Sequence, residues 1–175
     1  MPTDLCVDIG NTRLKWGRCP AGRVEEIAPL ADEPAAWESQ AARWSLSGNC
    51  RWAVASVHPE RRDRFAAWVR ARGGELLLID SYRQLPMRVE VDVPGGVGID
   101  RLLDALGSSS FRGESEPAVV VDAGTAVTVD AVAADGAFLG GYILPGLRLL
   151  ADSPHRHTAK LPLVSDFSPA APVPR

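Results

Sequence analysis

The chain has 175 residues, of which 46% are hydrophobic and 23% are charged, and its formal net charge at pH 7 is −3. This size and composition predict a soluble globular protein with one substantial core or two small lobes. The slightly acidic balance argues against a nucleic-acid partner, and the apolar runs are too short to cross a membrane.

The start of the chain and its cysteines indicate the cellular compartment. Met1 to Asp4 leads directly into an apolar segment, without a basic stretch or a cleavage site. No secretory signal is therefore expected, and we predict a cytoplasmic protein. Cys6, Cys19 and Cys50 lack Cys-x-x-Cys spacing, so we expect reduced structural thiols.

The first predicted element is a hairpin. Residues 5–9 have the apolar and β-branched content of a buried strand, Gly10-Asn11 can adopt positive φ, and residues 13–16 can return antiparallel. Asp8 then lies at the end of the strand, beside the turn. This order of residues predicts a carboxylate and a tight turn in one place.

Such a turn suits a phosphate group. Its backbone N–H groups and the Thr12 hydroxyl can converge on an anion, while Asp8 can hold a hydrated Mg²⁺ and Lys15 offers positive charge. The alternative is a structural hairpin with an exposed acid, because Asp-x-Gly turns are common where strands end.

Helices and strands follow in alternation. We expect an edge strand, a helix, a strand, a second helix and a further strand at residues 24–27, 35–44, 52–57, 60–72 and 76–79. The strand, helix and strand within 52–80 should form a parallel, right-handed unit. The arginines of the second helix, at positions 61, 62, 64, 70 and 72, are expected to form its solvated face.

A glycine-rich approach to a helix forms the second candidate site. Residues 87–93 alternate as in a half-buried strand, and the helix after Pro94 to Gly98 places Asp100 where an N-cap is expected. Asp100 could act as a base and Arg101 could bind the anionic end of a substrate. The alternative is that Asp100 only caps the helix.

The order strand, Asp, any residue, Gly, turn and strand occurs a second time, at residues 119–130. Aligning Asp8 with Asp122 and Gly10 with Gly124 predicts two related lobes that face each other across a cleft. Transfer of a phosphoryl group needs carboxylates from opposite walls of such a cleft. We assign residues 1–112 to the N-terminal lobe and 118–175 to a partial C-terminal lobe.

The last predicted elements are a strand at 137–143 and a short helix from Pro145 to near Ala151. Gly140-Gly141 would permit the close approach of another backbone or a nucleotide. From Ser165 onward the chain is rich in Pro and Ala and is expected to be a loosely held tail.

Several of these segments together resemble the type III pantothenate kinases, members of the acetate and sugar kinase, Hsp70 and actin superfamily. The matching segments are Asp8 to Gly17, Pro94 with Gly98 to Arg101, Asp122 to Asp130, Gly140 to Gly146, and Thr158 to Pro162. The resemblance implies an α/β fold of two ribonuclease H-like, actin-like ATPase lobes, the second incomplete because family members continue beyond Arg175.

By resemblance, the activity is ATP-dependent phosphorylation of pantothenate to 4'-phosphopantothenate, the first step of coenzyme A biosynthesis. The implied cofactors are ATP, Mg²⁺ near Asp8 and a monovalent cation, K⁺ or NH₄⁺, held by Asp122. The implied ATP-binding residues are Asp8, Ile9, Gly10, Asn11, Thr12, Arg13, Leu14, Lys15 and Thr125. The implied pantothenate-binding residues are Gly98, Ile99, Asp100 and Arg101, with Asp100 as the catalytic base.

The resemblance also implies a homodimer, and an oligomer would bury the apolar side chains of Leu139, Ile143, Leu147 and Leu150. One position departs from the family pattern, because Val91 stands where a substrate-contacting tyrosine is usual. The alternative function is that of a catalytically silent ATP-binding relative that acts as a binding or regulatory module.

Overall fold

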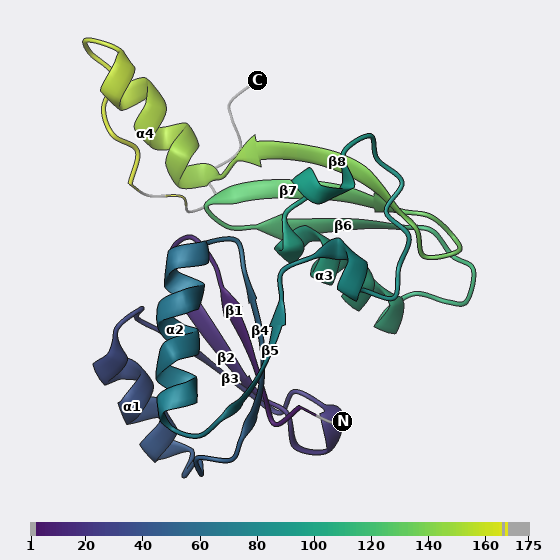
Figure 1. Cartoon of the computed structure of the whole chain (residues 1–175). Helices are drawn as coiled ribbons and strands as arrows, with labels where there is room; N and C mark the ends of the chain where they lie inside the picture. Colours follow the sequence, from purple (N-terminus) through teal and green to yellow (C-terminus); the bar gives the residue numbers. More distant parts are fainter. Residues whose placement is uncertain (1–2, 166, 168–175) are drawn as a thin grey trace.

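The structure is a computed structural model that describes residues 3–165 and residue 167 (Figure 1). The described residues form a mixed α/β fold with one five-stranded and one three-stranded sheet. The tail predicted from Ser165 onward lies almost wholly outside the described residues. No helix within the described part of the chain is both long and apolar enough to span a membrane.

The first sheet combines an antiparallel and a parallel half. Its strands are β1 (Leu5–Ile9), β2 (Leu14–Arg18), β3 (Glu26–Leu30), β4 (Arg51–Ser56) and β5 (Glu75–Ile79), in the order β3-β2-β1-β4-β5. Strand β2 pairs antiparallel with β1 and β3, while β4 pairs parallel with β1 and β5. The predicted first hairpin and the predicted parallel unit are therefore confirmed.

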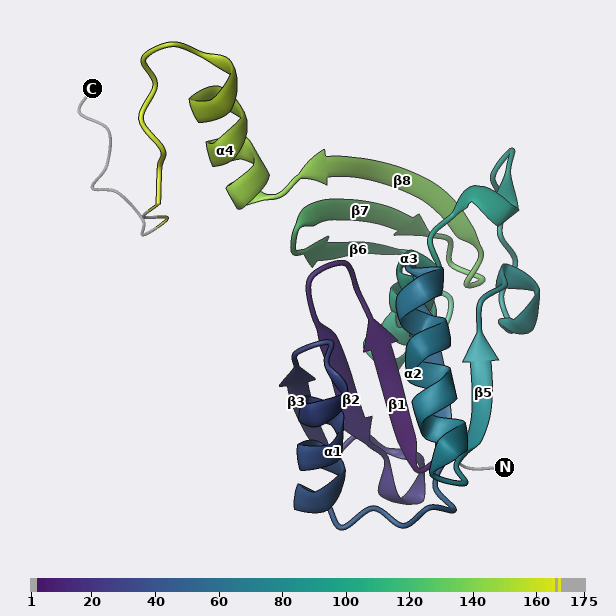
Figure 2. The ribbon, with the colours of Figure 1, turned by 60° about the vertical axis from the view of Figure 1, so that its left-hand side comes forward.

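Two helices cover one face of this sheet, as Figures 1 and 2 show. They are α1 (Pro34–Arg43) and α2 (Pro59–Ala71). Leu5, Val7 and Ile9 alternate along β1 and join this core, because successive side chains of a strand point to opposite faces. Aromatic rings fill the layer between the sheet and the helices: the Trp37 and Phe65 centroids lie 5.1 Å apart in an edge-to-face arrangement.

We predict that Phe65→Ala will lower the free energy of unfolding by about 3–5 kcal/mol, because Phe65 is fully buried and its loss leaves a cavity among rigid rings. Urea unfolding followed by tryptophan fluorescence measures the change. Phe111→Ala is the matched control, since Phe111 is 93% exposed and its truncation should have little effect. Equal losses in both variants would contradict this account of the core.

The second sheet repeats the antiparallel half of the first. Its strands β6 (Ala118–Ala123), β7 (Ala126–Val132) and β8 (Phe138–Pro145) form an antiparallel meander, as β1, β2 and β3 do. The close backbone approach predicted at Gly140-Gly141 is present, because a Cβ at Gly141 would lie 2.0 Å from the carbonyl oxygen of Val129.

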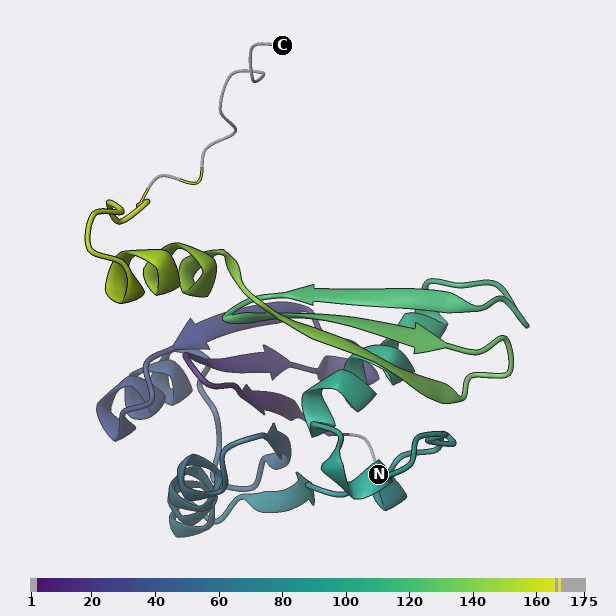
Figure 3. The ribbon, with the colours of Figure 1, turned by 90° about the horizontal axis from the view of Figure 1, so that it is seen from above.

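Helix α3 (Ile99–Gly107) lies between the two sheets (Figures 1 and 3). Its buried side chains Ile99, Leu102 and Ala105 share a second hydrophobic cluster with Ala55 of β4 and with residues of β7 and β8. This cluster unites residues from before and after the connection at 107–117. The division into lobes at 1–112 and 118–175 therefore stays a prediction.

Three predicted elements differ in the structure. Residues 87–93 form no strand and make one isolated bridge, Val89 with Phe138, because the segment has no partner strand along its length. The edge strand lies at 26–30 instead of 24–27, and its edge position tolerates Pro29. The last helix is α4 (Leu147–His157), longer than predicted, since Pro145 ends β8 and the N-cap is Gly146.

Candidate active site

Two turns meet where the sheets adjoin. The first turn, Gly10 to Thr12, joins β1 to β2, and the second turn, Gly124-Thr125, joins β6 to β7. A hydrogen bond of 2.8 Å links the hydroxyl groups of Thr12 and Thr125, and Figure 2 shows the β1–β2 connection reaching the second sheet. The structure thus places face to face the two turns that the repeat pairs in the sequence.

Asp8 lies on the face of β1 opposite the aromatic core. The alternation that buries Val7 and Ile9 turns Asp8 to the other side, where Lys15 donates a hydrogen bond of 3.2 Å to its carboxylate. Both side chains are about half exposed, so this pair is screened by solvent. Among the residues implied to bind ATP, Ile9 and Leu14 are fully buried and offer a ligand only their backbone.

A fourth carboxylate joins the three that the sequence singled out. Asp104 follows Asp100 by one helical turn, so both lie on one face of α3. Partial burial and, in decreasing order, the negative charges of Asp122, Asp100 and Asp8 together raise the pKa of Asp104 to about 6, against a smaller lowering by the Lys15 ammonium. The three other carboxylates therefore act on Asp104, and the four-residue spacing from Asp100 was the sequence signal for it.

The helix start differs from the prediction for Asp100. Gly98 is the N-cap of α3, and Asp100 is the second helical residue, exposed to solvent, with its carboxylate accepting the N–H of Arg101 at 2.8 Å. The helix begins earlier because the Gly98 carbonyl already accepts the N–H of Leu102. The side chain of Ile99 points into the second hydrophobic cluster.

Arg101 binds a buried partner. Its Nε donates to both carboxylate oxygens of Asp130, at 3.0 and 3.1 Å, and its Nη2 donates to one of them. The guanidinium also lies 5.6 Å from the centroid of the Phe138 ring. The hydrogen bonds that Arg101 donates to the Asp130 carboxylate raise the pKa of Arg101 above its usual value. Arg101 thus fixes α3 against β7, and its contact with a substrate stays a prediction.

Val91 packs beside the second sheet. Its Cγ1 lies 3.2 Å from the place of a Cβ at Gly140, whose φ of +91° favours glycine. Val91 thus helps to close the second hydrophobic cluster.

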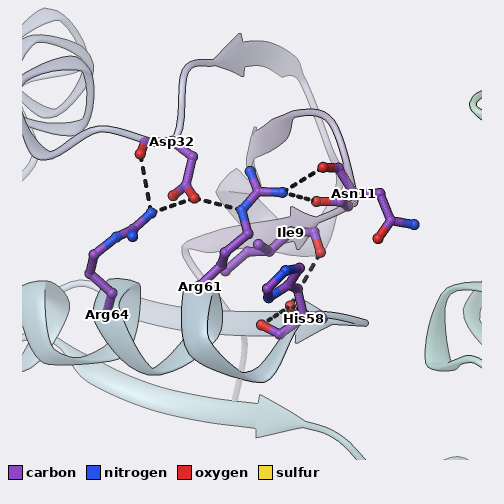
Figure 4. A network of polar contacts seen from close by, with 8 residues as sticks. Ile9, Asn11, Asp32, His58, Arg61 and Arg64 are labelled. Carbon is purple, nitrogen blue, oxygen red and sulfur yellow. Dashed lines mark hydrogen bonds and ion pairs between the residues drawn. The ribbon is translucent and has the colours of Figure 1, made fainter.

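One arginine of α2 does not belong to a solvated face. Arg61 is 13% exposed and donates to the carbonyl oxygens of the first turn, at Gly10 and at Asn11, the latter over 2.9 Å (Figure 4). The sequence prediction was wrong at this position, because helix periodicity could not show that the turn packs above the start of α2.

The donor set suits the metal ions implied by resemblance only in part. No three His, Cys, Asp or Glu side chains of the described chain converge closely enough to hold a metal ion by themselves. Mg²⁺ bound to phosphates needs one or two carboxylates besides water, and Asp8 with the Thr12 hydroxyl fits that need. For a monovalent cation the residues offer one exposed carboxylate, that of Asp122.

We predict a pH dependence of stability from Asp104. Its carboxyl has a pKa of about 6 in the folded chain and 3.8 as the ordinary value, so the folded protein binds this proton more tightly. The free energy of unfolding contributed by Asp104 therefore falls as pH rises from about 4 to about 6 and is level above that. The Asp104→Asn variant should lack this pH-dependent part of the free energy of unfolding.

Urea midpoints of both proteins at pH 4.5 and pH 7 test this, without divalent cations or nucleotide. The variant should gain stability relative to the wild type at the higher pH. A difference between the two proteins that is the same at both pH values would contradict the prediction.

The fold and the paired Asp-x-Gly turns define a sugar kinase-like ATPase fold. The model of the type III pantothenate kinase family matches residues 4–175, and the chain belongs to this family. The type III pantothenate kinases of Chlorobium luteolum, Synechococcus sp. (strain JA-3-3Ab) and Herminiimonas arsenicoxydans are 34%, 32% and 35% identical to it. The alignments cover 94%, 97% and 92% of this chain, and the chain spans 63%, 61% and 66% of those relatives.

Solved structures support the fold. A structure described as a Baf family transcriptional activator from Campylobacter jejuni aligns with a TM-score of 0.56 at 20% identity, over 88% of this chain and 60% of that one. A structure described as a 2-dehydro-3-deoxygalactonokinase from Sinorhizobium meliloti aligns with a TM-score of 0.50 at 15% identity, over 88% and 57%.

Proposed function

We propose that this protein transfers the γ-phosphoryl group of ATP to the primary hydroxyl of pantothenate in the cytoplasm. The product is 4'-phosphopantothenate, so the reaction opens coenzyme A biosynthesis. Family membership supports a kinase that uses ATP and a divalent metal. The observation that carries the proposal is the contact of Thr12 with Thr125, which joins the two Asp-x-Gly turns.

In the proposed mechanism the residues mainly position the reactants and neutralise charge. The backbone N–H groups of the first turn, the Thr12 hydroxyl and the Lys15 ammonium hold the ATP phosphates. Asp100 is exposed at the start of α3. Its carboxylate accepts the proton of the pantothenate hydroxyl while the hydroxyl oxygen attacks the γ-phosphorus and ADP leaves. Gly98 and the backbone of Ile99 line the approach to that carboxylate.

The metal ions belong to the proposal as well. Mg²⁺, held through water by Asp8, would neutralise the charge of the phosphates. Asp122 would hold the monovalent cation, K⁺ or NH₄⁺, near the second turn. Asp104 extends this acidic region, and a bound cation would offset the repulsion among the four carboxylates.

A coupled assay for ADP tests the function, with ATP, Mg²⁺, a potassium salt and pantothenate. We expect pantothenate-dependent ADP release, reduced about 10²-fold to 10⁴-fold in Asp100→Asn, because the variant cannot accept the proton. Arg70→Gln, an exposed change on α2, is the control and should leave the rate unchanged.

Equal rates in Asp100→Asn and the wild type would overturn the assignment of the base. ATP binding that is lost in Asp8→Ala, in a protein without turnover, would instead support the catalytically silent ATP-binding relative. Val91, which stands in the place of the usual tyrosine, bears instead on the affinity for pantothenate and on the identity of the substrate.

We also propose a homodimer that uses β8 and α4. Leu139, Ile143, Leu147 and Leu150 are exposed by 47%, 63%, 62% and 53%, and such a group of apolar side chains favours association. Sedimentation equilibrium should show a dimer that Ile143→Glu weakens and Phe111→Glu, an exposed change on another segment, does not. A stable monomer at micromolar concentration would contradict it.

A further inference from the structure

Arg61 reaches the first turn from the side of α2. It lies near the N-terminus of that helix, and its Nη1 donates to the carbonyl oxygens of Gly10 and Asn11 (Figure 4). Its Nε donates to the carboxylate of Asp32 at 2.5 Å, so one planar guanidinium joins the turn to the segment before α1. Arg61 and Asp32 are 13% and 14% exposed, which shields both from water.

The carboxylate of Asp32 remains charged between two arginines. Partial burial raises its pKa, yet the hydrogen bonds from Arg61 and Arg64 outweigh this effect and hold the pKa below its usual value. Arg64 donates to the same carboxylate oxygen at 2.5 Å and to the Asp32 carbonyl oxygen at 3.2 Å. Asp32 therefore keeps the Arg61 guanidinium oriented toward the turn.

Three successive carbonyl groups lie against side-chain donors of β4 and α2. The Ser56 hydroxyl of β4 lies 3.2 Å from the carbonyl oxygen of Ile9 and 3.0 Å from that of His58, and Arg61 donates to the carbonyl oxygens of Gly10 and Asn11. In a trans peptide the C=O and the following N–H point in opposite directions. Fixing the carbonyls of Gly10 and Asn11 therefore directs the N–H groups of Asn11 and Thr12 away from Arg61.

This arrangement has a consequence for anion binding. Peptide N–H groups attract a phosphate, whereas carbonyl oxygens repel it, so a turn that binds phosphate must hold its carbonyls on the far side. We propose that Arg61, oriented by Asp32, is a positioning residue that holds the first turn with its N–H groups toward the triphosphate of ATP. The proposal rests on the proposed function in taking ATP phosphates as the ligand of this turn.

Arg61→Lys is the sharpest variant, because lysine keeps the charge but cannot contact Asp32 and two carbonyls at once through a planar fork. Arg70→Lys is the matched control, an exposed position on the same helix. Calorimetric titration should show ATP·Mg²⁺ bound about tenfold more weakly by Arg61→Lys, the size expected for losing charged hydrogen bonds. Adenosine affinity and the melting temperature should stay close to those of the wild type.

Asp32→Asn should weaken ATP binding in the same direction, since Arg61 loses its charged partner. ATP affinity that is unchanged in Arg61→Lys, or adenosine and ATP weakened equally, would overturn the positioning role.

Hydrogen exchange gives a second readout that needs no ligand. The amides of residues 10–13 should exchange faster in Arg61→Lys than in the wild type or Arg70→Lys, while those of β4 stay protected. A wild-type protein that binds no ATP would refute the proposed function alone, and the exchange rates would still decide whether Arg61 holds the turn. Unchanged exchange in Arg61→Lys would refute the further inference alone.

Discussion

The candidate site depends on the burial of one side of helix α3. Ile99, Leu102 and Ala105 must leave water together, and the space that accepts them lies between β4 and the second sheet. Once that side is buried, the helix period places Asp100 and Asp104 on the other side, where the charges of Asp122 and Asp8 reach Asp104. The ion pair of Arg101 with the buried Asp130 then prevents the helix from rotating, because a rotation would leave a charge unpaired away from water.

Local patterns in the sequence predicted most of the fold. A hairpin such as β1–β2 is determined by an apolar strand and a turn dipeptide that are neighbours in the chain, so the sequence shows both. The strand predicted at 87–93 was wrong because its formation depends on residues far away in the chain. Its alternating pattern is that of a strand, yet a strand needs a partner along its length, and the start of β8 offers one bridge at Val89.

The site was predicted less completely than the fold. Asp8 and Asp122 could be singled out because each precedes a recognisable turn, whereas Asp130 was included only as the last residue of the repeated segment. Its function as the partner of Arg101 depends on the pairing of β7 with β8, where Gly141 leaves room: a Cβ there would lie 2.5 Å from the Asp130 carboxylate. Arg61 was missed because the residues it contacts are 50 and 51 positions away along the chain.

The two turns also show where an internal repeat stops being informative. Both follow the order Asp, any residue, Gly, yet the structure supports them in different ways. The first turn is held by the long side chain of Arg61, whereas the second is held by backbone: the N–H of Gly146 donates to the Thr125 carbonyl at 3.0 Å. A Cβ at Gly146 would lie 2.2 Å from the Gly124 carbonyl, so only glycine permits that approach.

The repeat therefore fixes the shape of each hairpin, while the neighbouring elements give the turns different charge: a cation lies behind the first and an uncharged backbone behind the second. This asymmetry is what a site needs if one turn is to receive the phosphates and the other is to close the opposite wall.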